Sequence, residues 1–186
     1  LYNTLTFEEL AEGLYFEGVD PEYATAENLA VVAYKAVLSK LGLPMPGLRI
    51  SVQAEIPICR GLGSSAALIA AGAAGANANH GSPLTRAELL AVCNDIEGHP
   101  DNLAPAIFGG LVASFVENER PYIARYSLHK RLRCTALIPD FQLSTHLARG
   151  VLPKEVPYGD AIFNVSRTAV LLRALEEGDT ETISVS

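Results

Sequence analysis

The sequence predicts an α+β fold, in which helices are inserted between strands, and three features carry this prediction. Residues 48–55 alternate apolar and polar side chains, as in a half-buried strand. Residues 65–79 are rich in alanine and have a strong helix propensity. Strand-like and helix-like stretches then follow one another along the chain with no internal repeat, which favours α+β architecture.

The first part of the chain predicts two short strands and a helix. The strands are expected at residues 4–7 and 14–16, and they are joined by a segment with three acidic residues, Glu8, Glu9 and Glu12. Thr25 is expected to cap a helix that runs to about Lys40 and ends at Gly42.

The later part predicts a helix with a clear start signal and six further elements. Thr85 and Glu88 form a capping-box pattern, and the helix that follows ends at Gly98. A short helix, three strands, a helical turn and a long amphipathic helix are then expected, in this order: residues 102–108, 111–116, 122–126, 133–138, 145–149 and 161–176. A boundary near Pro139 would divide the chain into domains of residues 1–138 and 139–186.

Composition excludes several classes of protein. The chain has 186 residues, of which 49% are hydrophobic and 19% charged, as in globular domains. Its net charge of -7 and the lack of a basic cluster argue against a nucleic-acid surface. No apolar run reaches the roughly 18 to 20 residues that span a bilayer.

The three cysteines are odd in number and widely spaced, so they fit neither a disulfide framework nor a zinc site. The first residues include no basic segment of a secretory signal, and a cytoplasmic location is expected.

The stretch 57–67 is the strongest candidate for chemistry. Gly61 and Gly63 flank one leucine, so the backbone can turn tightly and bring its N–H groups close to a bound group. Ser64 and Ser65 stand where a helix would begin, where they can cap it or reach a ligand. Such a helix start suits a phosphate group. A corner without a ligand remains the alternative, since the stretch is neither a P-loop nor a dinucleotide fingerprint.

The stretch 97–102 is the second candidate. Glu97 and Asp101 are four residues apart across a Gly-His-Pro break, so they can point into one pocket. One carboxylate would hold a cation, and the other would meet a substrate proton or amine. The alternative is an ordinary helix end followed by an Asp/Asn cap, with His99 as a structural hydrogen-bonding group.

Three motifs resemble one enzyme family. The run from Pro57 resembles the phosphate loop of the GHMP kinases, whose pattern is Pro, three residues, then Gly-Leu-Gly-Ser-Ser-Ala. A second motif looks specifically like homoserine kinases. It is Glu-Gly-His-Pro-Asp-Asn at residues 97–102, followed after one residue by Ala-Pro-Ala-Ile-Phe-Gly-Gly. Residues 144–153 resemble the pattern Ser-Thr-x-x-Ala-Arg-x-Val-Leu-Pro of that family. The resemblance covers roughly residues 2–179.

The resemblance implies a two-lobe fold and a kinase activity. The N-terminal, ATP-binding lobe would resemble domain 2 of ribosomal protein S5, and residues 139–186 would begin a ferredoxin-like C-terminal lobe. The implied reaction transfers the γ-phosphoryl group of ATP to the side-chain hydroxyl of L-homoserine in threonine biosynthesis, with Mg²⁺. A homodimer is one option, and neither nucleic acid nor membrane is expected as a partner.

The resemblance also implies a role for each matching residue. ATP would be bound by Pro57, Arg60, Gly61, Leu62, Gly63, Ser64, Ser65, Ala66, Ala67 and, near the nucleoside, Asn28. Mg²⁺ would be held by Ser65 (or Ser64) and Glu97. Homoserine would be contacted by His99, Asp101, Asn102, Thr145 and Arg149.

Three of these residues are the implied catalytic group: Glu97, Asp101 and Arg149. Arg149 would clamp the carboxylate of the amino acid, a task that suits its planar guanidinium. Asp101 is assigned as a substrate contact first and as a base second.

Two family segments have no counterpart in this sequence. Members begin with a Pro-Ala-Thr-Ser-Ala-Asn-Leu-Gly-Pro-Gly-Phe-Asp-type segment and end with a Ser-Gly-x-Gly-Pro-type loop, so an incomplete chain is expected. Two alternatives stay open: another GHMP kinase that acts on a sugar or isoprenoid alcohol, and a nucleotide-binding fragment without turnover.

Overall fold

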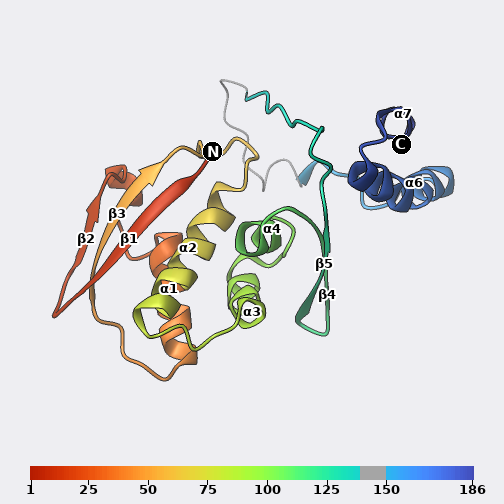
Figure 1. Cartoon of the computed structure of the whole chain (residues 1–186). Coiled ribbons are helices and arrows are strands. Elements are labelled where there is room, and N and C mark those ends of the chain that lie inside the picture. The colour runs from red at the N-terminus through yellow and green to blue at the C-terminus, as the bar shows by residue number, and fades with distance from the viewer. Residues whose placement is uncertain (139–149) are drawn as a thin grey trace.

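A three-stranded sheet, four helices and a β-hairpin form the first part of the chain in the computed structural model, which describes residues 1–138 and 150–186 (Figure 1). In chain order the elements are β1 (Asn3–Leu10), β2 (Leu14–Glu17), η1 (Pro21–Tyr23), α1 (Leu29–Lys40), β3 (Gly47–Ala54), α2 (Ser64–Asn79), α3 (Arg86–Glu97), α4 (Leu103–Phe108), β4 (Leu111–Glu117), β5 (Arg120–Tyr126), α6 (Tyr158–Glu177) and α7 (Thr180–Val185). This mixture confirms the predicted α+β class.

The sheet has the strand order β1-β3-β2. β1 runs antiparallel to β3, and β2 runs parallel to it, so that both Phe7 and Phe16 lie opposite Ile50. The parallel pair is joined through α1, as a parallel connection requires. Leu48 and Ile50 are fully buried, and the half-buried Phe7 and Phe16 pack against the same core.

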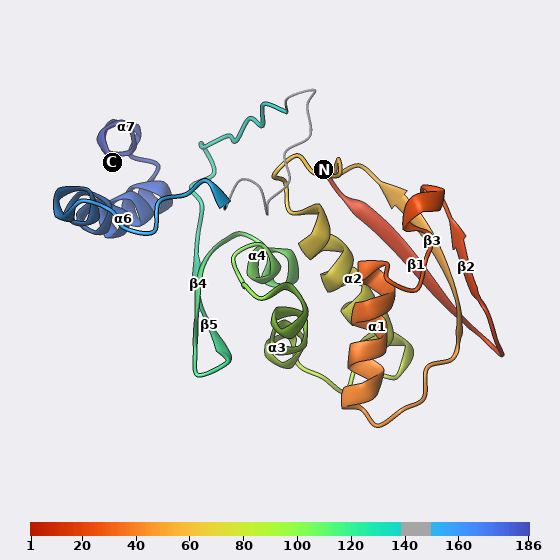
Figure 2. The same ribbon diagram turned by 180° about the vertical axis from the view of Figure 1, so that it is seen from behind.

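Helix α2 lies between the sheet and the pair α3 and α4, and the β4–β5 hairpin lies beyond that pair (Figures 1 and 2). Small residues allow this close packing. A side chain at Gly72 would meet the backbone carbonyl of Ala30 in α1, and one at Gly75 would meet the ring of Phe7. The alanine-rich composition of α2 is therefore a packing requirement as well as a source of helix propensity.

Replacing Gly72 by alanine is expected to lower the free energy of unfolding by about 1–3 kcal/mol, because overpacking forces α1 and α2 apart. Urea denaturation measures the change. Gly159→Ala is the matched control, since Gly159 is also a helical glycine but has open space around it. It is expected to be neutral or slightly stabilising. Equal stability of the two variants would contradict the packing argument.

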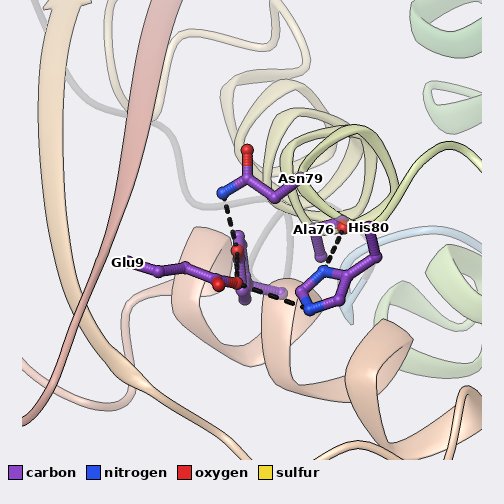
Figure 3. Close-up of polar contacts among 5 residues, drawn as sticks. Glu9, Ala76, Asn79 and His80 are labelled. Atoms are coloured by element: carbon purple, nitrogen blue, oxygen red, sulfur yellow. Dashed lines mark hydrogen bonds and ion pairs between the residues drawn. The ribbon is translucent and has the colours of Figure 1, made fainter.

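A polar cluster ties β1 to both central helices (Figure 3). The hydroxyl of the fully buried Tyr34 in α1 donates to Oε1 of Glu9 at 2.6 Å and accepts from Nδ2 of Asn79 at 2.9 Å. The ring of His80 lies 3.0 Å from the carbonyl oxygen of Ala76 through Nδ1 and 3.7 Å from Glu9 Oε1 through Nε2. Glu8 and Glu9 both lie in β1, opposite Arg49 and Leu48 of β3, so the prediction that they lie in a connection is wrong.

Burial, together with the hydrogen bond to Glu9, raises the pKa of Tyr34 above its ordinary value. The unfolded chain releases this proton above about pH 10, whereas the folded chain retains it, so stability falls as pH rises beyond that value. Tyr34→Phe is expected to have a lower free energy of unfolding than wild type at pH 8. The difference between the two proteins should narrow between pH 10 and 11. Urea unfolding at several pH values measures this difference, and a gap that stays constant from pH 8 to pH 11 would contradict the argument.

The helix boundaries confirm most of the start and stop signals. Thr85 and Glu88 form the predicted capping box, and Gly98 and Gly178 end α3 and α6 in left-handed conformations. The predicted cap at Thr25 is wrong, because Asn28 caps α1 by accepting a hydrogen bond from the Ala30 amide.

The structure differs from the prediction at two places in the later part of the chain. Residues 133–138 are not a strand, and the described part of the chain provides no strand beside them; Leu137 is 93% exposed. Their β-propensity alone is insufficient, since a strand is stabilised by its neighbours. Helix α7, which Asp179 caps, was not predicted. None of the described helices combines the length and the hydropathy needed to cross a membrane.

Candidate active site

The loop between β3 and α2 has the backbone geometry of an anion-binding turn. Cys59, Gly61 and Gly63 have left-handed conformations, with φ of 56°, 72° and 72°. Left-handed residues in such a turn can gather N–H groups into a concavity that suits an anion. Gly63 is the N-cap residue of α2, no side chain caps this helix, and its first turn has no acidic residue. The first N–H groups of α2 therefore remain available to a ligand.

Ser65 and Glu97 meet beside this loop. Oγ of Ser65, in the first turn of α2, donates to Oε1 of Glu97, the last residue of α3, at 2.7 Å. Both residues are half-buried. The serines therefore do not cap α2; Ser65 instead fixes the carboxylate of Glu97 next to the loop between β3 and α2.

The donor set of this pair fits Mg²⁺. A hydroxyl and a carboxylate are hard oxygen ligands, and Mg²⁺ in kinases takes one or two protein ligands, with water and phosphate oxygens completing its shell. Within residues 1–138 and 150–186 no three His, Cys, Asp or Glu side chains group to hold a metal. Ser65 and Glu97 could supply two oxygen ligands to such an ion beside the loop.

The turn between α3 and α4 packs against the loop. Nδ1 of His99 lies 2.5 Å from Oδ1 of Asp101, and the same oxygen accepts a hydrogen bond from the Asn102 amide at 2.9 Å. The carboxamide of Asn102 lies beside Gly63, since a Cβ added at Gly63 would be 3.3 Å from Oδ1 of Asn102. The sequence held no signal for this contact, because it depends on how α2, α3 and α4 pack together.

The structure thus brings two of the sequence motifs together. The loop residues Pro57, Arg60, Gly61, Leu62 and Gly63 lead directly into α2, which holds Ser64, Ser65, Ala66 and Ala67 in its first turn. Through Ser65 and Gly63 they contact the 97–102 turn.

The remaining predicted site residues are Asn28, Thr145 and Arg149. The side chain of Asn28 caps α1 and donates to the carbonyl oxygen of Tyr23 at 2.9 Å, so its place near the nucleoside stays a prediction. Thr145 and Arg149 lie outside the described residues, as does the expected boundary near Pro139.

Sequence relatives are homoserine kinases. The family model described as GHMP kinases N terminal domain matches residues 28–110. The homoserine kinase of Clostridium botulinum is 44% identical over 183 residues, and that of Clostridium beijerinckii is 38% identical over 184 residues. Each match covers 98% of this chain, and the chain spans 62% of the length of each relative.

Solved structures show the same fold. The homoserine kinase from Cytophaga hutchinsonii matches with a TM-score of 0.78 at 24% identity, over 97% of this chain and 59% of that one. The phosphomevalonate kinase of Streptococcus pneumoniae matches with a TM-score of 0.72 at 12% identity, over 97% and 65%. Residues 28–110 therefore match a GHMP kinases N terminal domain in sequence, and the chain has the fold of these solved kinases.

Proposed function

We propose that the protein containing this chain phosphorylates the side-chain hydroxyl of L-homoserine with ATP and yields O-phospho-L-homoserine, a step of threonine biosynthesis. One observation carries the proposal: an uncapped helix start, a Ser65–Glu97 oxygen pair and the polar 97–102 turn lie next to one another. The relatives, which are 44% and 38% identical, are named homoserine kinases, and this name supports L-homoserine as the acceptor.

In this proposal the chain acts by binding and positioning. The N–H groups of the 61–65 segment bind the phosphates, and Ser65 and Glu97 hold Mg²⁺. A bound Mg²⁺ would neutralise charge that develops on the transferred phosphoryl group. The acceptor is oriented beside the loop by His99, Asp101 and Asn102. Phosphoryl transfer depends on such positioning more than on covalent help from the protein. Thr145 and Arg149 are proposed to contact the amino-acid end of homoserine.

We assign residues 1–138 to the ATP-binding lobe and residues 139–186 to the start of the C-terminal lobe. Helix α6 supports the second assignment, because several of its apolar side chains are exposed: Ile162, Phe163, Val165 and Val170. Such a face is typical of a helix that packs against further structure. A cytoplasmic location and a homodimer remain part of the proposal.

The test is a coupled assay of the natural polypeptide that carries this sequence, with ATP, Mg²⁺ and a panel of acceptors. Turnover with L-homoserine, and little with mevalonate, phosphomevalonate or galactose, is the expected result. Preferential turnover of another alcohol would replace homoserine with that substrate. ATP binding without any turnover would leave a nucleotide-binding protein and contradict the proposal.

A further inference from the structure

Gly61 and Gly63 have the same backbone conformation but different surroundings. Both have φ of 72°, a left-handed conformation that favours glycine. A Cβ added at Gly61 would meet no atom within 4 Å. A Cβ added at Gly63 would lie 3.3 Å from Oδ1 of Asn102 and 3.5 Å from its Cβ and its Cγ. Backbone conformation therefore accounts for a glycine at both positions, and at Gly63 the side chain of Asn102 is a second reason.

The backbone of Asn102 is fixed by α4, whereas its side chain is exposed. The next two residues, Leu103 and Ala104, are fully buried. The Asn102 amide donates to Oδ1 of Asp101 at 2.9 Å, and the Asn102 carbonyl oxygen accepts from the Ala106 amide at 3.2 Å. The side chain makes no hydrogen bond that caps α4. The carboxamide is therefore accessible to a ligand, and it lies beside the phosphate loop.

We propose that Gly63 is a positioning residue for the acceptor, because the room it leaves determines where the carboxamide of Asn102 meets L-homoserine. This inference rests on the proposed function and deepens it, since it gives the phosphate loop a role on the acceptor side. Gly63 is the N-cap residue of α2. The backbone segment that presents the first N–H groups of α2 to phosphate is thus the same segment that borders Asn102.

Gly63→Ala and Gly61→Ala form a matched pair that tests this role. Each adds one methyl group at a φ of 72°, so the backbone cost is the same. Only the methyl at residue 63 displaces the carboxamide of Asn102. Gly63→Ala is therefore expected to raise the KM for L-homoserine by roughly 10-fold, about the worth of one hydrogen bond, and Gly61→Ala by less than about 2-fold.

Steady-state assays of the natural polypeptide, at ATP concentrations that saturate each variant, measure the KM for L-homoserine separately from that for ATP. Saturation with ATP removes the contribution of weakened nucleotide binding, which both variants share. Equal KM values for L-homoserine in the two variants would overturn the inference.

The double variant Gly63→Ala/Asn102→Ala tests whether Gly63 acts through Asn102. In the Asn102→Ala background the added methyl would meet only the Cβ of residue 102, at 3.5 Å, which is an ordinary packing distance. Gly63→Ala should then raise the KM for L-homoserine by less than about 3-fold beyond Asn102→Ala alone. Multiplication of the two single effects would show that Gly63 does not act through Asn102. Thermal unfolding of each variant confirms that it is folded.

NMR of the asparagine side-chain amides provides a readout that needs no activity. The Asn102 signals are those lost in Asn102→Ala. They are expected to shift in Gly63→Ala and to stay in place in Gly61→Ala, and unshifted signals in Gly63→Ala would overturn the positioning role. A wild type that does not phosphorylate L-homoserine would instead overturn the proposed function, and with it the acceptor part of this inference, whatever the NMR comparison shows.

Discussion

Gly63→Val is expected to weaken ATP binding by more than 100-fold while the chain stays folded. Gly63 has φ of 72°, which is costly for any side chain and most of all for a β-branched one. A Cβ at this position would also lie 3.3 Å from Oδ1 of Asn102. If the backbone relaxes to negative φ, it turns the first N–H groups of α2 away from the phosphates. Titration with an ATP analogue and Mg²⁺ measures the loss.

Gly42→Val is the control that isolates the effect of the site. Gly42 has φ of 70°, follows α1 and has open space around it, so the backbone strain is matched. Both variants are expected to lose about 1–2 kcal/mol of stability from the left-handed conformation. Only Gly63→Val should lose ATP binding. Retained binding in Gly63→Val, or an equal loss in Gly42→Val, would show that the loop does not hold the phosphates.

Local signals predicted those elements of the fold whose ends are determined by their own residues. The capping box at Thr85 and Glu88 and the glycine at residue 178 encode their helix boundaries locally. Residues 133–138 are rich in apolar side chains but form no strand. Strand pairing depends on a neighbouring strand, which the local sequence does not specify. The order β1-β3-β2 is likewise a property of the packed chain.

The candidate site shows the same limit. The turn and the helix start at residues 61–65 could be predicted, because the spacing of glycine and serine encodes both. The pairing of Ser65 with Glu97 followed from family resemblance, and the structure shows the hydrogen bond that joins them. The contact between Asn102 and Gly63 joins residues 39 positions apart by number, and it arises only when α4 packs against α2. No pattern along the chain contains that information.

Glu97→Gln is expected to lower kcat/KM by roughly 100-fold or more and to raise the Mg²⁺ concentration needed for half-maximal turnover. Metal stabilisation of transition-state charge is worth several kcal/mol, and each 1.4 kcal/mol is tenfold in rate. The fold should be unaffected, because the amide oxygen of glutamine still accepts the hydrogen bond that Ser65 donates at 2.7 Å to Glu97. Steady-state assays over a range of Mg²⁺ concentrations measure both quantities.

Asp95→Asn separates metal binding from a general loss of negative charge. Asp95 lies on the same helix two residues earlier and is exposed, so its replacement removes the same charge outside the Ser65–Glu97 pair. If the metal is held by the pair, this control keeps the Mg²⁺ dependence of wild type. An unchanged Mg²⁺ dependence in Glu97→Gln would mean that the hydrogen bond between Ser65 and Glu97 serves only to join α2 to α3. The assignment of Ser65 and Glu97 as metal ligands would then be wrong.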